Sequence, residues 1–136
     1  MQFRTLCKWM VVAGTLVIWM IKLFIRPYGP WDEAGTFFLG VAPNFLGAFL
    51  VPFAAYWLYT HPMFFNGRLL RFPFCSDTRI VCLFGFFLAL VNEYLQLIPV
   101  FGRTFDYYDL AFTVAGLLIA YYAFGAIYRR LAFYEL

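Results

Sequence analysis

Four long apolar runs occupy most of this chain, at about residues 6–25, 36–59, 79–100 and 107–128. A helix needs about 20 apolar residues to cross roughly 30 Å of hydrocarbon, and each run is close to that length. Because the bilayer interior offers no partner for backbone N–H and C=O groups, a spanning segment must satisfy them within a helix. The sequence therefore predicts an all-α membrane protein, a bundle of four transmembrane helices.

The residues outside these runs are too few to build a soluble domain. Hydrophobic residues make up 65% of the 136 residues and charged residues only 12%, whereas a soluble domain carries about a quarter charged residues. We therefore expect one membrane domain over residues 1–136, with lipid as its main partner. The basic residues stand beside the apolar runs and form no polar cluster, so we expect no nucleic-acid binding. Pro43 and Pro52 predict that the second helix is bent, or broken in its outer part.

The lysines and arginines fall on two sides of the predicted bundle. Short loops rich in Lys and Arg stay in the cytoplasm. One side holds Arg4, Lys8, Arg68, Arg71, Arg79, Arg129 and Arg130, and the other holds Lys22, Arg26 and Arg103. This imbalance predicts that both termini and the segment 61–78 are cytoplasmic, and that the turns after the first and third helices face outward.

Polar residues interrupt the third apolar run near its outward end, where Asn92, Glu93 and Gln96 occur. A charged side chain inside a membrane costs about 3 kcal/mol on insertion scales, and it normally faces the protein interior or water. Glu93 and Gln96 are three positions apart, so they share one helix face. Side chains kept at this cost are candidates for function.

The following turn and the start of the fourth helix add Arg103, Asp106 and Asp109. A guanidinium beside several carboxylates pairs with at least one of them. Crowded carboxylates repel one another, which favours retention of a proton by one. Asn44 falls at a similar depth in the second helix by residue count. We therefore predict a polar pocket that opens outward and is lined by Asn44, Glu93, Gln96, Arg103, Asp106 and Asp109.

Simpler structural roles compete with this pocket. Asp106 and Asp109 are placed to cap the fourth helix, where carboxylates satisfy free amides and favour the helix dipole. Glu93 and Arg103 are able to form an ion pair that only holds two helices together. Both alternatives stay open. Asp32 and Glu33 are interpreted as residues of a solvated loop, with a place at the border of the pocket as the alternative.

Metal and cofactor chemistry has little support. His61 is the only histidine and the three cysteines contain no CxxC pair, so we expect neither a metal site nor a cofactor. An enzyme using Glu93 or Asp109 as a general acid–base catalyst is less favoured, because no recognisable nucleophile or phosphate loop accompanies them. A proton or ion transporter would use the same acids, but four helices are few for a pathway unless the protein oligomerises. No catalytic residue is assigned.

The order of these polar residues resembles the VanZ-like membrane proteins, a family named for a teicoplanin-resistance protein. The family pattern runs Glu, two residues, Gln, a loop to Arg, two Asp three apart, then Asn and Gly. Glu93, Gln96, Arg103, Asp106, Asp109 and Gly116 stand in this order here, with Thr113 at the usual Asn and Ala120 at a frequent second Gly. Residues 43–53, PNFLGAFLVPF, look like the family's asparagine-then-proline second helix.

The resemblance implies a multi-pass protein of the bacterial cytoplasmic (inner) membrane, linked to the cell envelope and to low-level glycopeptide tolerance. It implies that the polar cluster is the functional centre, but it carries no reaction. We expect the cluster to bind a headgroup, an envelope intermediate or a glycopeptide-related ligand. The alternative is a small accessory subunit of a larger membrane complex, in which the cluster is structural or binds the partner.

Overall fold

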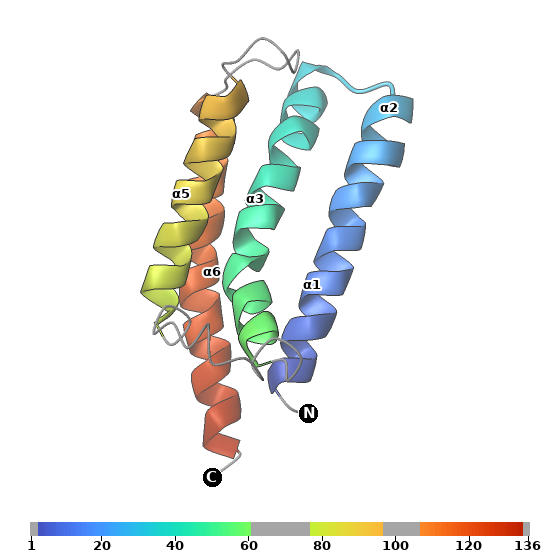
Figure 1. Cartoon of the computed structure of the whole chain (residues 1–136). Coiled ribbons are helices and arrows are strands. Elements are labelled where there is room, and N and C mark those ends of the chain that lie inside the picture. Colours follow the sequence, from blue (N-terminus) through green and yellow to red (C-terminus); the bar gives the residue numbers. More distant parts are fainter. Residues whose placement is uncertain (1–2, 61–76, 97–106, 135–136) are drawn as a thin grey trace.

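A computed structural model describes residues 3–60, 77–96 and 107–134, and these residues form a bundle of helices with no strand among them (Figure 1). The first helical segment is α1 (Phe3–Met20), continued by a π-helical turn (Ile21–Ile25) and α2 (Arg26–Tyr28). The other three are α3 (Glu33–Tyr59), α5 (Thr78–Gln96) and α6 (Tyr107–Tyr134). The predicted all-α fold with four helical segments is confirmed.

Three of these segments are long and apolar enough to cross a membrane: Phe3–Tyr28, Glu33–Leu58 and Tyr107–Leu131. In α5 the part with described side chains, Thr78–Val91, is apolar as well. Large apolar side chains on the outside include Trp19, 61% exposed, and Leu83, 67% exposed. Lipid would cover such side chains, so length and composition mark the chain as a membrane protein.

The helices alternate in direction, so the N- and C-termini lie at the same end of the bundle (Figure 1). We call this the terminal end and the opposite one the far end. Of the described basic residues, those near helix ends at the terminal end are Arg4, Lys8, Arg79, Arg129 and Arg130, and those at the far end are Lys22 and Arg26. The predicted sorting of these charges holds; the cytoplasmic orientation of the terminal end stays a prediction.

The core of the bundle lies where α3 packs between α1 and α6, with α5 resting mainly on α6. Phe53 of α3 is fully buried and meets Phe3, Cys7 and Phe124 from the two neighbouring helices. The Phe124 ring centroid is 5.4 Å from that of Phe3 and 5.4 Å from that of Phe53, both edge-on. Such aromatic pairs stabilise by about 0.5–1.5 kcal/mol beyond their buried area. This aromatic cluster therefore fastens three helices together near the terminal end.

Glycine sets the separation of α3 and α6. A Cβ placed on Gly116 would lie 2.5 Å from the carbonyl oxygen of Phe45 and 3.0 Å from the Cβ of Ala48. Small residues allow membrane helices to approach closely enough for backbones to touch. The absence of a side chain at Gly116 is thus a requirement of this contact.

The second helix is longer and more regular than the prolines predicted. It runs without interruption through Pro43 and Pro52, both buried, so the predicted break in its outer part is wrong. Each proline removes one backbone hydrogen bond, but packed neighbours hold the rest of the helix in place. The helix also starts at Glu33 rather than near residue 36, because the Asp32 side chain accepts the Gly35 N–H at 2.8 Å. Asp32 is an N-cap residue and not merely part of a solvated loop.

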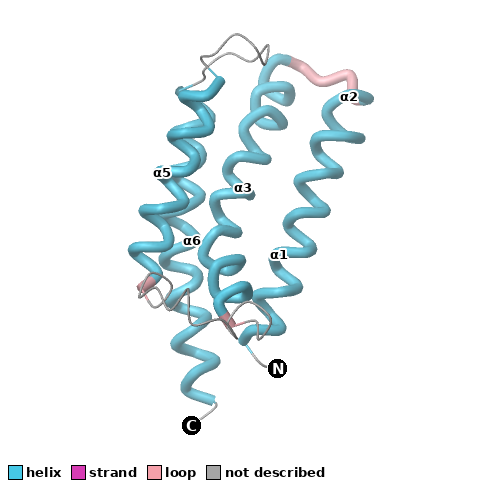
Figure 2. Tube along the Cα trace, viewed as in Figure 1, coloured by secondary structure: helices cyan, strands magenta, loops and turns pink. Residues whose placement is uncertain are grey.

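The π-helical turn at Ile21–Ile25 was not predicted. Its signature is the backbone N–H of Arg26, which donates to the carbonyl of Ile21. Pro27 follows at once; it has no N–H, and its ring would clash with the carbonyl four residues earlier. A wider turn before it relieves that clash. The short loop after α2 (Figure 2) is closed by Trp31, whose indole N–H donates to the Ile25 carbonyl at 2.8 Å.

Candidate functional site

The structure describes the predicted polar cluster in part. Asn44 is half-buried on α3, and Asp109 is half-buried in the first turn of α6. Glu93 and Gln96 belong to the last turns of α5, but their side chains are outside the described residues. Arg103 and Asp106 also lie outside the described residues, so their part in the cluster stays a prediction.

Contacts between the helices fix the relative heights of these positions. A Cβ on Gly85 of α5 would lie 2.8 Å from a methyl carbon of Val51 on α3 and 3.4 Å from a methyl carbon of Leu117 on α6. Gly85 and Leu117 therefore stand at about one level of the bundle. Because α5 and α6 are roughly aligned (Figure 1), residue counts from this level give heights on these two helices.

Counted from that level toward the far end, Glu93 and Asp109 coincide in height, since each lies eight residues, ~12 Å, beyond its own reference residue. Direct contacts between α3 and α6 set the height of Asn44. Phe37 meets Tyr108 and Phe112, and Gly116 meets Phe45 and Ala48. Asn44 therefore lies roughly 9 Å nearer the terminal end than Asp109. We call Glu93 and Asp109 the polar layer.

Asn44 and Asp109, although at different heights, both lie on helix faces that meet a neighbouring helix. A spacing of seven residues returns to nearly the same face, with a drift of about 20°. Asn44 is seven positions from Val51, so it shares the face that meets α5. Asp109 is seven positions from Gly116, so it shares the face that meets α3. Both residues therefore belong to the region where α3, α5 and α6 converge.

Glu93 lies 14 positions from Arg79 along α5, a distance of ~21 Å, which is less than the hydrocarbon thickness of about 30 Å. A carboxylate at hydrocarbon depth must face other helices, water or a ligand.

Thr113, which stands where the VanZ-like pattern has Asn, has a local hydrogen bond. Its side chain is only 8% exposed, and its hydroxyl donates to the Asp109 carbonyl at 2.8 Å. This bond within one helical turn satisfies the hydroxyl. It also ties Thr113 to the first turn of α6, directly beneath the polar layer.

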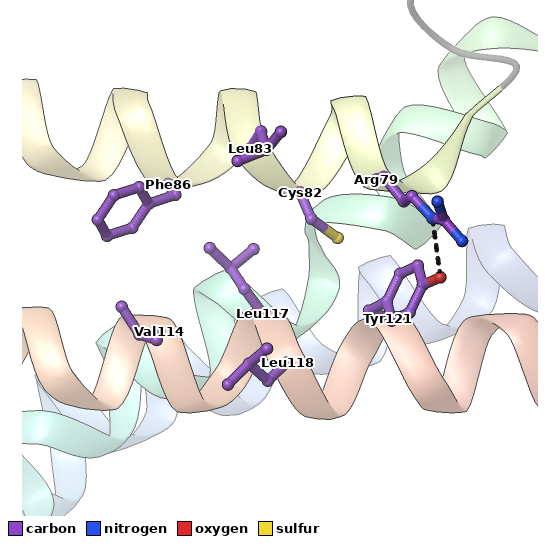
Figure 3. Close-up of a pocket in the computed structure, with 8 residues that line it drawn as sticks. All are labelled: Arg79, Cys82, Leu83, Phe86, Val114, Leu117, Leu118 and Tyr121. Carbon is purple, nitrogen blue, oxygen red and sulfur yellow. Dashed lines mark hydrogen bonds between the residues drawn. The ribbon is translucent and has the colours of Figure 1, made fainter.

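Sequence reasoning missed a second feature, a groove between α5 and α6 with a volume of about 450 Å³. Its lining is apolar except at one end, where the Arg79 Nε–H donates to the Tyr121 hydroxyl at 3.2 Å (Figure 3). The lining consists of Arg79, Cys82, Leu83, Phe86, Val114, Leu117, Leu118 and Tyr121. Arg79 was interpreted only as an orientation signal. Its spacing of three and seven from Cys82 and Phe86 was the available sign that it shares their face.

The described residues offer no group of three His, Cys, Asp or Glu side chains that would hold a metal ion. No protein-family model matches the chain, and comparison with curated proteins and with solved structures found no match either. The resemblance to VanZ-like proteins thus rests on the ordered polar residues themselves.

Proposed function

We propose that this chain is a VanZ-like integral membrane protein of the bacterial cell envelope, whose polar layer binds a polar headgroup, a lipid-linked envelope intermediate or a glycopeptide-related ligand. The observation that supports the proposal is the common height of Glu93 and Asp109 on the neighbouring helices α5 and α6. Two adjacent membrane helices rarely carry carboxylates at one level without a use for them, because each is costly there.

The chemistry of the layer fits recognition better than catalysis. Carboxylates accept hydrogen bonds from ammonium, amide and hydroxyl groups, which envelope intermediates present. Asn44, nearer the terminal end, is able both to donate and to accept. Arg103 would add a bidentate donor for a phosphate or carboxylate. In this proposal the far end faces outward from the inner membrane, where such ligands are exposed.

Conservative variants in a bacterial host exposed to teicoplanin test this proposal. Glu93→Gln and Asp109→Asn keep size and remove charge, so both should lower tolerance relative to the unaltered chain at equal protein level. Glu33→Gln is the matched control, because Glu33 is an exposed carboxylate in the first turn of α3. Unchanged tolerance in both layer variants, or no tolerance from the unaltered chain, would refute the proposed role.

A second candidate is an accessory subunit of a larger membrane complex. The observation that favours it is the set of exposed aromatic side chains on the first helical segment, where Trp9, Trp19 and Phe24 are 57%, 61% and 62% exposed. Aromatic side chains are enriched where proteins bind one another. Extraction in a mild detergent followed by native mass measurement should then give a complex heavier than one chain. A monomer without co-purifying protein would count against this function.

A further inference from the structure

We propose that the groove between α5 and α6 is a binding site for one anionic phospholipid, with an acyl chain along the groove and the phosphate at Arg79. This site is near the terminal end and is separate from the polar layer. It therefore does not depend on the envelope function proposed above.

The groove has the shape and direction of an acyl-chain site. Its volume of about 450 Å³ falls within the range of about 300–1,000 Å³ typical of ligand sites. On α5 the lining runs from Arg79 to Phe86, and on α6 from Tyr121 to Val114. Each stretch spans ~10.5 Å along the helix axis. The groove thus extends from the membrane surface toward the bilayer centre, parallel to the lipid chains.

The groove has an apolar body and a cationic end, which match the acyl chain and the anionic headgroup of a phospholipid. Leu83, Phe86, Leu117 and Leu118 supply apolar surface deeper in the groove, and Arg79 stands at its shallow end (Figure 3). Arg79 is in the first turn of α5, where an anionic headgroup would lie at the same height. The charges and the depths of protein and lipid therefore match along the whole groove.

The guanidinium of Arg79 is oriented but keeps donors for a ligand. Its Nε–H donates to the Tyr121 hydroxyl at 3.2 Å, which positions the planar group beside the groove. The terminal NH₂ groups make no hydrogen bond or ion pair within the part of the chain that the structure describes. Asp77 is near, but its carboxylate accepts the backbone N–H of Arg79 at 2.9 Å as a helix cap. Two parallel N–H donors suit two phosphate oxygens.

A lipid explains the exposed cation better than a second copy of the chain would. A second copy packing into the groove would cover Arg79 with the apolar side chains that dominate the outside of these helices. That arrangement buries an unpaired charge, which is strongly unfavourable. An anionic headgroup neutralises the charge while its chain fills the apolar part.

Native mass spectrometry of the purified full chain tests this site by titration with phosphatidylglycerol and with phosphatidylcholine of identical acyl chains. We expect phosphatidylglycerol to bind about fivefold more tightly, as one basic residue near the membrane surface contributes about 1 kcal/mol toward anionic lipid. Arg79→Gln should abolish this preference. Arg130→Gln is the matched control, because Arg130 is an exposed arginine at the same end and outside the groove, and it should retain the preference.

A second pair of variants tests the chain-binding part. Val114→Phe fills the groove and should weaken both lipids, whereas Ile119→Phe, on the exposed side of α6 and 51% exposed, should weaken neither. Far-UV circular dichroism checks that each variant is folded. Equal affinity for the two lipids, a preference that survives Arg79→Gln, or a dimer dissociated by Val114→Phe would overturn the proposal. Teicoplanin tolerance is measured separately, so either proposal can fail alone.

Discussion

The contact at Gly116 gives the sharpest test of the packing between α3 and α6. In Gly116→Ala, the new Cβ would meet the Phe45 carbonyl oxygen at 2.5 Å, where ordinary contact is 3.4 Å or more. The helices must separate by about 1 Å, which also weakens dispersion contacts along the interface. Overpacking of this kind costs up to about 3 kcal/mol, and the better helix propensity of alanine offsets about 1 kcal/mol. We expect a net loss of about 2 kcal/mol.

Gly47→Ala is the matched control, because a Cβ there meets nothing within 4 Å. It should be neutral or should stabilise the protein by up to about 1 kcal/mol. The assay is equilibrium unfolding in mixed micelles with increasing dodecyl sulfate, followed by far-UV circular dichroism. The same Gly-to-Ala change should therefore destabilise the protein at position 116 but not at position 47. If Gly116→Ala is as stable as Gly47→Ala, then α3 and α6 do not approach as described.

Two further predictions concern the core and a helix start. Phe53→Ala should destabilise the protein by about 3–5 kcal/mol, because Phe53 is fully buried. The control Leu16→Ala, at a side chain 62% exposed, should change stability by less than about 0.5 kcal/mol. Equal shifts of the two variants in the thermal midpoint of unfolding would argue against the aromatic cluster as the core. Asp32→Ala should lower the free energy of unfolding by about 1 kcal/mol and speed hydrogen exchange at the Gly35 N–H. Asp32→Asn keeps an acceptor oxygen and should preserve most of the protection against exchange. Identical exchange rates in the two variants would disprove the cap.

Much of the fold was predictable because the bilayer limits the choices. An apolar run of about 20 residues has to become a helix in a membrane, whatever its neighbours are. The helix from residue 107 was placed correctly at its start for this reason. Its end at Tyr134 rather than near residue 128 was harder to predict, since a helix continues beyond the membrane when the following residues tolerate it.

Local irregularities were less predictable, because they depend on the environment of single groups. Pro43 and Pro52 predicted a bend or a break in the second helix, but α3 runs unbroken through both. Pro27, by contrast, follows a π-helical turn. The same residue type has different effects because packing around it differs.

The sequence by itself determined that the chain forms apolar helices, which charges share an end, and that costly polar residues occur near one end of α5. Only the tertiary structure decided that Glu93 and Asp109 share one height and that Asn44 lies nearer the terminal end, because contacts at Gly85 and Gly116 fix the register of the helices. It alone brought Arg79 to Tyr121 across the groove. Residues 42 positions apart meet through side-chain packing between helices, and no local pattern encodes that distance.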